Sequence, residues 1–322
     1  MDFICKEQGR LDKILQSKLE VPRNQVENLI KEVGVKVNDK VIKKSGFKLK
    51  EGDKVIVTLP RKEDKEYKDV DFDIDIIYED EDLLVINKPP FITVHPAPSV
   101  KEPTVVDWLR AKGISLSTLA AKERHGIVHR IDKETSGALV IAKNNDSHLA
   151  LSRQLEDKSM GRYYLSIIDL PLKEDMIVER PIARNPKNRL KMGIVPSGRE
   201  AKSAFIKLLL SKNSKKELIA AKLFTGRTHQ IRVHLSSLSR HILGDHLYGF
   251  KSKSDKINRI MLHAYIIYFI HPRTKQPMLF KAPLFEDFKE TAFRYFDTET
   301  FYEKIDPDYI ISRFDDFLKR LR

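Results

Sequence analysis

One stretch of the sequence, residues 125–137, concentrates side chains that could do chemistry. It holds two histidines, an arginine, an aspartate, a glutamate and a Thr-Ser-Gly turn, between two apolar runs. Arg130 and Asp132 are two residues apart, so in an extended segment their side chains share a face. An arginine beside a carboxylate keeps it ionised and orients it through paired hydrogen bonds. An isolated pair of this kind is more often a structural ion pair, so the rest of the chain must decide.

A second polar cluster lies further along the chain, at residues 225–235. Its sequence is Thr-Gly-Arg-Thr-His-Gln-Ile-Arg-Val-His-Leu, which includes Arg227 and Arg232. Two clusters rich in arginine favour a reactive carboxylate over a structural ion pair. A carboxylate can attack an electron-poor carbon of a sugar or a base and form a covalent intermediate. Asp132 is therefore the candidate nucleophile.

Breaking the glycosidic bond of a nucleoside fits a single nucleophilic carboxylate. Retaining glycosidases add a second carboxylic acid near the first, and Glu134 would share a face with Asp132 in an extended segment. That acid is unnecessary when the leaving group is uracil, because the uracil anion is delocalised over two carbonyl groups.

Three other kinds of site are not supported. The histidines form no H-x-x-x-H pair around a glutamate, Cys5 is the only cysteine, and arginines near the histidines disfavour a cation. The sequence has neither the G-x-S-x-G turn of a serine hydrolase nor the G-x-x-x-x-G-K-[ST] loop that cradles phosphates. We therefore expect no metal and no organic cofactor.

The elements that must position these residues divide into two domains. Residues 1–60 predict two helices, a hairpin around Asn38 and Asp39, and a closing strand. Residues 61–74 begin with an almost wholly charged run and predict a linker, with a half-buried strand over 71–76. Residues 75–322 are strand-rich and form the second, larger domain.

Apolar patterning predicts the elements of the second domain. Leu83–Ile86 and Ala138–Ala142 are expected strands, and Trp108 is expected to be half-buried on a helix that starts at Thr104. We expect a basic loop over 184–200 and a surface helix over 297–322. The remaining expectations are a helix over 145–155, strands over 163–168 and 265–270, and a hairpin of strands 203–209 and 218–224.

The charge is uneven along the chain. Of the net charge of +13, residues 1–60 carry +4 and residues 61–82 carry −7, which leaves +16 for residues 83–322. Such a surplus indicates a polyanionic partner. Because no apolar run is long enough to span a bilayer, no signal peptide is visible and only one cysteine is present, we expect a cytoplasmic protein with no membrane partner. Nothing in the sequence demands more than a monomer.

Several motifs, in order, resemble the RluA-type pseudouridine synthases, over roughly residues 75–285. The departures are mild: Ile131 stands for the usual leucine, Arg162 for lysine and Ser166 for alanine. The matching motifs are His129-Arg130-Ile131-Asp132-x-x-Thr135-Ser136-Gly137, Asn87-Lys88-Pro89 with His95-Pro96, Arg162-Tyr163-Tyr164-Leu165, residues 225–234, Gly244-Asp245 with Tyr248-Gly249, Leu262-His263-Ala264 and Lys281-Ala282-Pro283-Leu284.

The resemblance implies an RNA uridine-to-pseudouridine isomerase and a role for each site residue. It also implies an α+β catalytic domain over residues 75–322, with a mostly antiparallel mixed sheet and a central cleft. Asp132 would act on a flipped-out uridine, at C1′, at C6 or as a base at C2′. Tyr164 would stack on the uracil and take part in removing the C5 proton, and Arg232 would pair with Asp132. Arg130 would fill the space left by the flipped nucleotide or bind its phosphate. Arg227 would hold its loop and contact RNA.

The N-terminal domain resembles the S4 RNA-binding module. Arg10-Leu11-Asp12, Gly34-x-Val-x-Val-Asn38 and Gly52-Asp53-x-Val55 carry the resemblance, together with Arg23 and the apolar pair Leu29-Ile30. It implies contacts with phosphates of structured RNA, which position the RNA without selecting its sequence. The matching basic residues are Arg10, Arg23, Lys31, Lys36 and Lys40.

An S4 module on such a catalytic domain resembles enzymes that act on 23S ribosomal RNA of the large subunit, so rRNA or a precursor of that subunit is the expected partner. A transfer-RNA target remains the alternative. A third reading, a non-catalytic ribosome-assembly factor, would be expected to lack Asp132, Tyr164 or Arg232, and all three are present.

Overall fold

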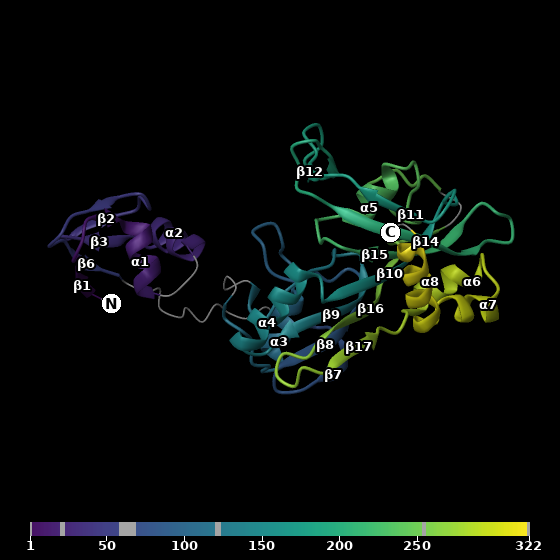
Figure 1. Cartoon of the computed structure of the whole chain (residues 1–322), viewed down its shortest axis with the longest axis horizontal. Helices are drawn as coiled ribbons and strands as arrows, with labels where there is room; N and C mark the ends of the chain where they lie inside the picture. Colours follow the sequence, from purple (N-terminus) through teal and green to yellow (C-terminus); the bar gives the residue numbers. More distant parts are fainter. Residues whose placement is uncertain (1, 20–22, 58–68, 120–123, 253–255, 321–322) are drawn as a thin grey trace. The chain divides into compact units, whose positions relative to one another are not determined.

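The computed structural model describes the chain except for residues 1, 20–22, 58–68, 120–123, 253–255 and 321–322 (Figure 1). The chain forms two compact units, Met1–Tyr67 and Lys68–Arg322. Residues 61–68, which form most of the charged run of the predicted linker, lie outside the described residues. Val70 and Phe72 pack against the apolar core of the second unit, and the strand expected from Asp71 begins only at Asp75.

The N-terminal unit packs two helices, α1 (Leu11–Leu19) and α2 (Arg23–Glu32), with a four-stranded sheet of order β1-β6-β3-β4. Asn38 and Asp39 both have positive φ, as the tight turn of a two-residue hairpin requires. The N-terminal unit has an apolar core of its own, which includes Leu11, Leu15 and Ile30. The strands are β1 (Asp2–Ile4), β2 (Gly9–Arg10), β3 (Val35–Val37), β4 (Lys40–Ile42), β5 (Lys48–Leu49) and β6 (Lys54–Ile56).

The second unit is built on a nine-stranded sheet in which eight strands follow the order β11-β14-β15-β10-β16-β9-β8-β7 and β17 pairs with β16. The described pairs are antiparallel except β9 with β16, which is parallel, so the predicted mixed α+β fold is confirmed. These strands are β7 (Asp75–Glu79), β8 (Leu83–Lys88), β9 (Ser136–Ala142), β10 (Gly161–Ile168), β11 (Met176–Glu179), β14 (Lys202–Leu210), β15 (Glu217–Leu223), β16 (Leu262–Ile270) and β17 (Pro277–Lys281).

The centre of this sheet is buried on both faces. Every residue of β8, β9 and β10 is buried, because apolar clusters cover both sides of the sheet. Three helices in this unit are α3 (Val105–Ala111), α4 (Asn145–Asp157) and α5 (Gln230–Ser236). Trp108 on α3 is 1% exposed and not half-buried as expected, since its indole N–H donates to Asp73 at 2.8 Å.

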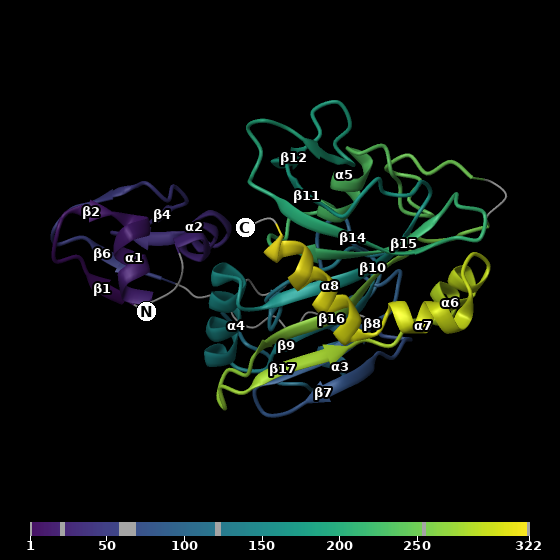
Figure 2. The ribbon, with the colours of Figure 1, turned by 45° about the vertical axis from the view of Figure 1, so that its right-hand side comes forward.

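The C-terminal segment is part of the core and not a single surface helix. It forms α6 (Glu286–Phe293), α7 (Thr298–Lys304) and α8 (Pro307–Lys319). Phe288, Phe301 and Phe314 are buried in the main apolar cluster. Figure 2 shows α8 running across the central strands, where Phe314 contacts Tyr163 of β10. The charged residues between these aromatics misled the sequence prediction.

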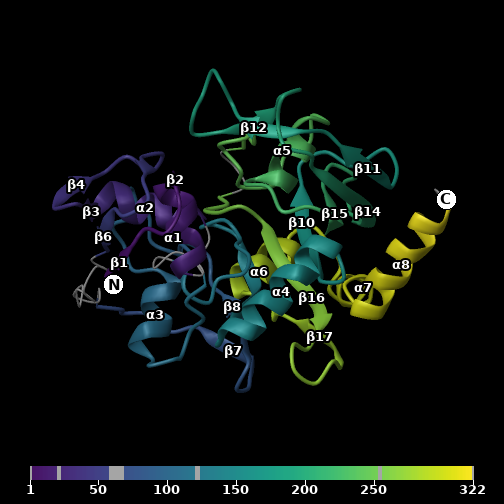
Figure 3. The ribbon, with the colours of Figure 1, turned by 60° about the vertical axis from the view of Figure 1, so that its left-hand side comes forward.

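The expected basic loop over 184–200 contains a short hairpin. Its strands are β12 (Ile182–Arg184) and β13 (Met192–Ile194), paired antiparallel. The hairpin projects away from the main sheet beside α5 (Figure 3). Among the helices described, none has the length and apolar character needed to cross a membrane.

Candidate active site

Asp132 lies in a turn directly before β9. Residues 129–132 belong to no helix or strand, and Arg130 and Asp132 both line the same cleft. The turn is closed by the backbone N–H of Thr135, which donates to the carbonyl of Asp132 at 3.1 Å. Glu134 does not line the cleft around Asp132, so no second carboxylate enters from this turn.

The buried Lys88 at the end of β8 supports the same turn. Its ammonium donates to the carbonyls of Pro89 at 2.6 Å, Ile92 at 2.9 Å and Lys133 at 3.1 Å. Burial lowers the pKa of Lys88 to about 7. Three carbonyl acceptors nonetheless match the three donors of the charged form. Lys88 thereby fixes the backbone next to Asp132.

The carboxylate of Asp132 pairs with Arg232, which α5 supplies. The Nη1 atom of Arg232 lies 3.3 Å from Oδ2 of Asp132, whose side chain is 17% exposed. Arg232 is 4% exposed and is clamped by Asp245, with Nε–Oδ2 at 2.8 Å and Nη2–Oδ1 at 2.9 Å. Its guanidinium also lies 4.9 Å from the ring centre of Tyr248. Burial alone would lower the pKa of Arg232, but the hydrogen bonds to Asp245 raise it, so the group facing Asp132 is a fixed cation.

His229 lies near the same carboxylate oxygen of Asp132 that Arg232 contacts. It precedes α5 with a left-handed φ of 57°, and its Nε2 is 3.9 Å from Oδ2 of Asp132. Its Nδ1 is 2.9 Å from the hydroxyl of Tyr248, which in turn accepts the N–H of Met192. Burial lowers the pKa of His229, although Asp132 opposes the shift. The ring is therefore neutral near pH 7 and leaves Arg232 as the cation at Asp132.

Tyr164 enters the cleft from β10. It lines the same cleft as Asp132 and Arg232, and burial raises its pKa above the ordinary tyrosine value. The phenol is thus protonated at neutral pH and presents an uncharged ring. The structure therefore brings the four predicted catalytic side chains, Asp132, Arg130, Tyr164 and Arg232, to one cleft from three elements far apart in the sequence.

Arg130 and Arg227 also line the cleft. Arg130 is exposed, and Arg227 donates from Nε to the carbonyl of Glu200 at 2.8 Å, which holds its loop. Arg162, two residues before Tyr164 on β10, faces the same cleft. The sequence analysis noted Arg162 only as a departure from the usual lysine, and so missed its place in the site.

The predicted RNA-binding residues of the N-terminal unit differ in their surroundings. Arg10 forms an ion pair at 2.8 Å with the buried Asp12, which commits part of its guanidinium to the fold. Lys31, Lys36 and Lys40 are exposed. The side chain of Arg23 lies outside the described residues.

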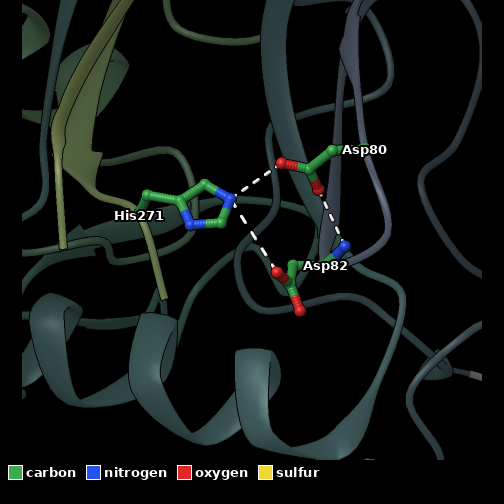
Figure 4. A group of neighbouring side chains, drawn as sticks. All are labelled: Asp80, Asp82 and His271. Atoms are coloured by element: carbon green, nitrogen blue, oxygen red, sulfur yellow. Dashed lines mark hydrogen bonds and ion pairs between the residues drawn. The ribbon is translucent and has the colours of Figure 1, made fainter. Parts of the chain in front are cut away.

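One group of side chains has the composition of a metal site. Asp80, Asp82 and His271 lie close together, with the imidazole between the two carboxylates (Figure 4). Asp80 already accepts from Tyr78 and His271 at 2.7 Å each, and Asp82 pairs with Arg273 at 2.7 Å. An arginine in the cluster opposes a cation. We interpret the cluster as an ion-pair network between the turn that joins β7 to β8 and the turn after β16.

Asp245 and Tyr248 are the residues of the site that sequence reasoning left without a role. Both lie in a loop with no regular structure, and both act on Arg232 and not on Asp132 directly. The pattern Gly244-Asp-x-x-Tyr-Gly249 was visible in the sequence, but its partner was not.

Fold and site together place a carboxylate, paired with a buried arginine, in a basic cleft, an arrangement suited to an enzyme with a polyanionic substrate. Comparison with known proteins supports this class of enzyme. The family model described as RNA pseudouridylate synthase matches residues 82–237, and the S4 domain model matches residues 9–55. An RNA pseudouridine synthase of Helicobacter pylori strain J99 is 51% identical over 313 residues, 95% of each chain.

Two further matches are informative. Ribosomal large subunit pseudouridine synthase D of Zymomonas mobilis is 37% identical over 290 residues, covering 86% of this chain and 91% of the relative. The solved structure of Human RNA Pseudouridylate Synthase Domain Containing 1 has a TM-score of 0.54 and 25% identity, covering 66% of this chain and 84% of that one. The chain belongs to the RNA pseudouridine synthase family, which confirms the predicted family and enzyme class.

Proposed function

We propose that this RNA pseudouridine synthase modifies large-subunit ribosomal RNA, with Asp132 as the nucleophile that acts on a flipped-out uridine. The observation that carries the proposal is the pairing of Asp132 with a clamped arginine, Arg232, in the cleft that Tyr164 also lines. The clamp by Asp245 keeps the guanidinium from following the substrate, so the carboxylate stays ionised and aimed.

The isomerisation needs little from the protein beyond this carboxylate. The bond between C1′ and N1 of uridine breaks, the uracil turns and a bond forms between C1′ and C5. The C5 hydrogen leaves as a proton, N1 takes up a proton, and Asp132 is released unchanged, so the product is an isomer of the substrate. The leaving uracil carries its charge on two carbonyl groups, so no second acid is required. The absence of Glu134 from the cleft lining is consistent with this.

Tyr164 stacks on the uracil while the base turns. Its buried ring offers an apolar face, and stacking on an aromatic side chain contributes about 1–3 kcal/mol per base. Because burial raises the pKa of Tyr164, little of it is ionised at neutral pH, which makes stacking its main part and proton removal the lesser one.

Arg130 and Arg227 bind the RNA strand at the cleft, and the exposed lysines of the N-terminal unit bind phosphates of structured RNA. Flipping a nucleotide costs a few kcal/mol of unstacking, which these charge contacts offset. The large-subunit target is supported by the Zymomonas mobilis relative, which is named as a ribosomal large subunit pseudouridine synthase, and by the S4 match. We propose that the enzyme acts in the cytoplasm as a monomer.

The choice between ribosomal and transfer RNA is tested with both kinds of RNA as substrates. Unmodified transcripts of 23S rRNA and a mixture of transfer-RNA transcripts, both made with C5-tritiated uridine, are incubated with the full chain. Tritium release from the 23S transcript alone is expected, at a stoichiometry that gives the number of uridines modified. Release from the transfer RNAs alone would overturn the ribosomal target. Tight binding of both RNAs without tritium release from either would favour the hypothesis of a non-catalytic ribosome-assembly factor.

A further inference from the structure

A second cavity, of about 530 Å³, lies beside the cleft that holds Asp132. Its volume is within the range of small-molecule binding sites. The two share Arg130, Arg162 and Arg227 in their linings, so a strand that places one nucleotide in the cleft passes the cavity. The cavity lining has one carboxylate, Glu156, against five cationic residues: Arg130, Lys158, Arg162, Lys222 and Arg227.

Arg162 stands out among these cations because it is buried without a counter-ion. Its exposed fraction is 7%, and its Nε has no hydrogen-bond partner among the described residues. The polar contact that the structure gives it is Nη1 to Nδ1 of His129, at 3.4 Å. In the described part of the chain, no carboxylate forms an ion pair with it.

The contact with His129 does not satisfy the guanidinium. The backbone N–H of Val140 points at Nε2 of His129 at 3.2 Å, so Nε2 is the accepting nitrogen. A neutral imidazole that accepts at Nε2 carries its proton on Nδ1, and burial holds the pKa of His129 well below its usual value. Nδ1 is then a donor and cannot accept from Arg162.

Two other buried arginines of the same unit each have a carboxylate partner. Arg232 donates to both carboxylate oxygens of Asp245, and Arg259 donates to both carboxylate oxygens of Asp287. Burying an unpaired charge destabilises a fold. Arg162 is buried on the wall between two cavities, and among the described residues its Nε has no acceptor and its charge has no counter-ion. Such a guanidinium is suited to bind an anionic group of the substrate.

Gly226 leaves room for this arginine. A Cβ atom at Gly226 would lie 3.3 Å from Nη2 of Arg162, tighter than an ordinary contact. Gly226 also lines both cavities, so the backbone of the 225–235 cluster packs against the guanidinium and leaves its other edges to the cavities.

We propose that Arg162 binds a phosphate group of the RNA strand, that of the nucleotide which occupies the second cavity next to the uridine in the cleft. This inference rests on the proposed function. The planar guanidinium donates two parallel hydrogen bonds to phosphate oxygens, which a point charge cannot do with the same direction. Anchoring the neighbouring phosphate fixes how far the uridine reaches toward Asp132.

The test compares Arg162→Met and Arg162→Lys with the wild type in the full chain. Affinity for the RNA from which the wild type releases tritium is measured between about 50 and 200 mM KCl. We expect Arg162→Met to make the slope of log K against log salt shallower by about 0.7 to 0.9, the value of one phosphate contact. Arg162→Lys keeps the slope. Lys281→Met, which removes an exposed charge from the edge strand β17, is the matched control and keeps it as well.

Thermal unfolding without RNA separates this role from a structural one. Arg162→Met removes an unpaired buried cation. We therefore expect its unfolding midpoint either to equal that of the wild type or to lie about 2–4 °C above it. An unchanged salt slope in Arg162→Met would overturn the proposal. So would a midpoint lowered by several degrees together with a slope that Arg162→Lys fails to keep, because a structural arginine behaves in that way.

The failure of this inference is distinguishable from failure of the proposed function. Tritium release by the wild type tests the function alone, and the salt slope tests Arg162 alone. Wild-type release combined with an unchanged slope in Arg162→Met overturns only the phosphate site.

Discussion

In the proposed mechanism, the reactivity of Asp132 depends on the side chains that hold Arg232 against its carboxylate. Arg232 contacts the carboxylate, Asp245 accepts from Nε and Nη2 of Arg232 with its two oxygens, and Tyr248 lies against the guanidinium. This arrangement separates two tasks, because the arginine supplies charge while the aspartate behind it supplies position. Positioning alone can be worth about 100-fold in rate.

Replacing the clamp tests this separation. We expect Asp245→Asn to reduce the single-turnover rate of tritium release by about 100-fold while leaving RNA affinity within about 3-fold, since Arg232 is then free to turn away from Asp132. The matched control is Asp287→Asn, which weakens the clamp on Arg259 away from the cleft. That control is expected to lower stability and leave the rate of the folded enzyme unchanged. Equal rate losses in both variants would contradict the account.

At the scale of elements, the parallel pairing of β9 with β16 sets the position of the reactive turn. Ser136 and Gly137 pair with His263 and Ala264 across these strands. The hydroxyl of Ser136 is 2.9 Å from Nδ1 of His263, whose Nε2 donates to the carbonyl of Ala282. Gly137 is required here, because a Cβ atom would lie 2.2 Å from the carbonyl oxygen of Ala264.

This strand contact makes a prediction about pH. Burial lowers the pKa of His263 to about 3, against about 6.5 in the unfolded chain. Between those values the unfolded chain binds a proton that the folded one does not, so His263 lowers the free energy of unfolding as the pH falls below about 6.5. We expect urea unfolding of His263→Gln to lose less stability between pH 7 and pH 5 than that of the wild type.

The single tryptophan makes this measurement specific. Trp108 is buried in the catalytic unit, so its fluorescence reports the unfolding of that unit. His246→Gln, at an exposed position, serves as the control and should keep the wild-type dependence on pH. If His263→Gln lost stability toward acid as steeply as the wild type, the neutral buried role of His263 would be wrong.

Sequence patterning predicted the elements well where apolar residues repeat and less well where charges interrupt them. The strands over 83–86, 138–142 and 163–168 were found because every position in them is buried, and both N-terminal helices were found because their apolar residues recur at helical spacing. The C-terminal helices were misread as surface, since Phe301 and Phe314 alternate with charged residues. Pairings such as Arg232 with Asp245 depend on tertiary folding, which local spacing does not encode.

At the scale of the whole molecule, the chain joins an RNA-binding unit with its own core to a large catalytic unit. The separate apolar clusters mean that surface lysines of the N-terminal unit can be changed without disturbing the cleft. Their contribution is expected to be electrostatic and independent of sequence.

Replacing Lys31, Lys36 and Lys40 together by glutamine tests this division. Loss of three phosphate contacts is expected to make the slope of log K against log salt shallower by about 2 to 3. The single-turnover rate at saturating enzyme should not change. The control replaces Lys13, Lys48 and Lys50, which are exposed on the same unit, and is expected to retain most of the wild-type slope. Equal effects of the two triple variants would mean that RNA binding is not confined to the predicted lysines.

The most direct test of the central claim is single-turnover release of tritium from RNA containing C5-tritiated uridine, by the wild type and by Asp132→Ala. Arg232 keeps its clamp on Asp245 in the variant, so folding and RNA affinity should be retained. The account predicts stoichiometric release by the wild type and none by Asp132→Ala at equal RNA occupancy. Release by Asp132→Ala at a rate near that of the wild type would contradict it and assign the chemistry to another group.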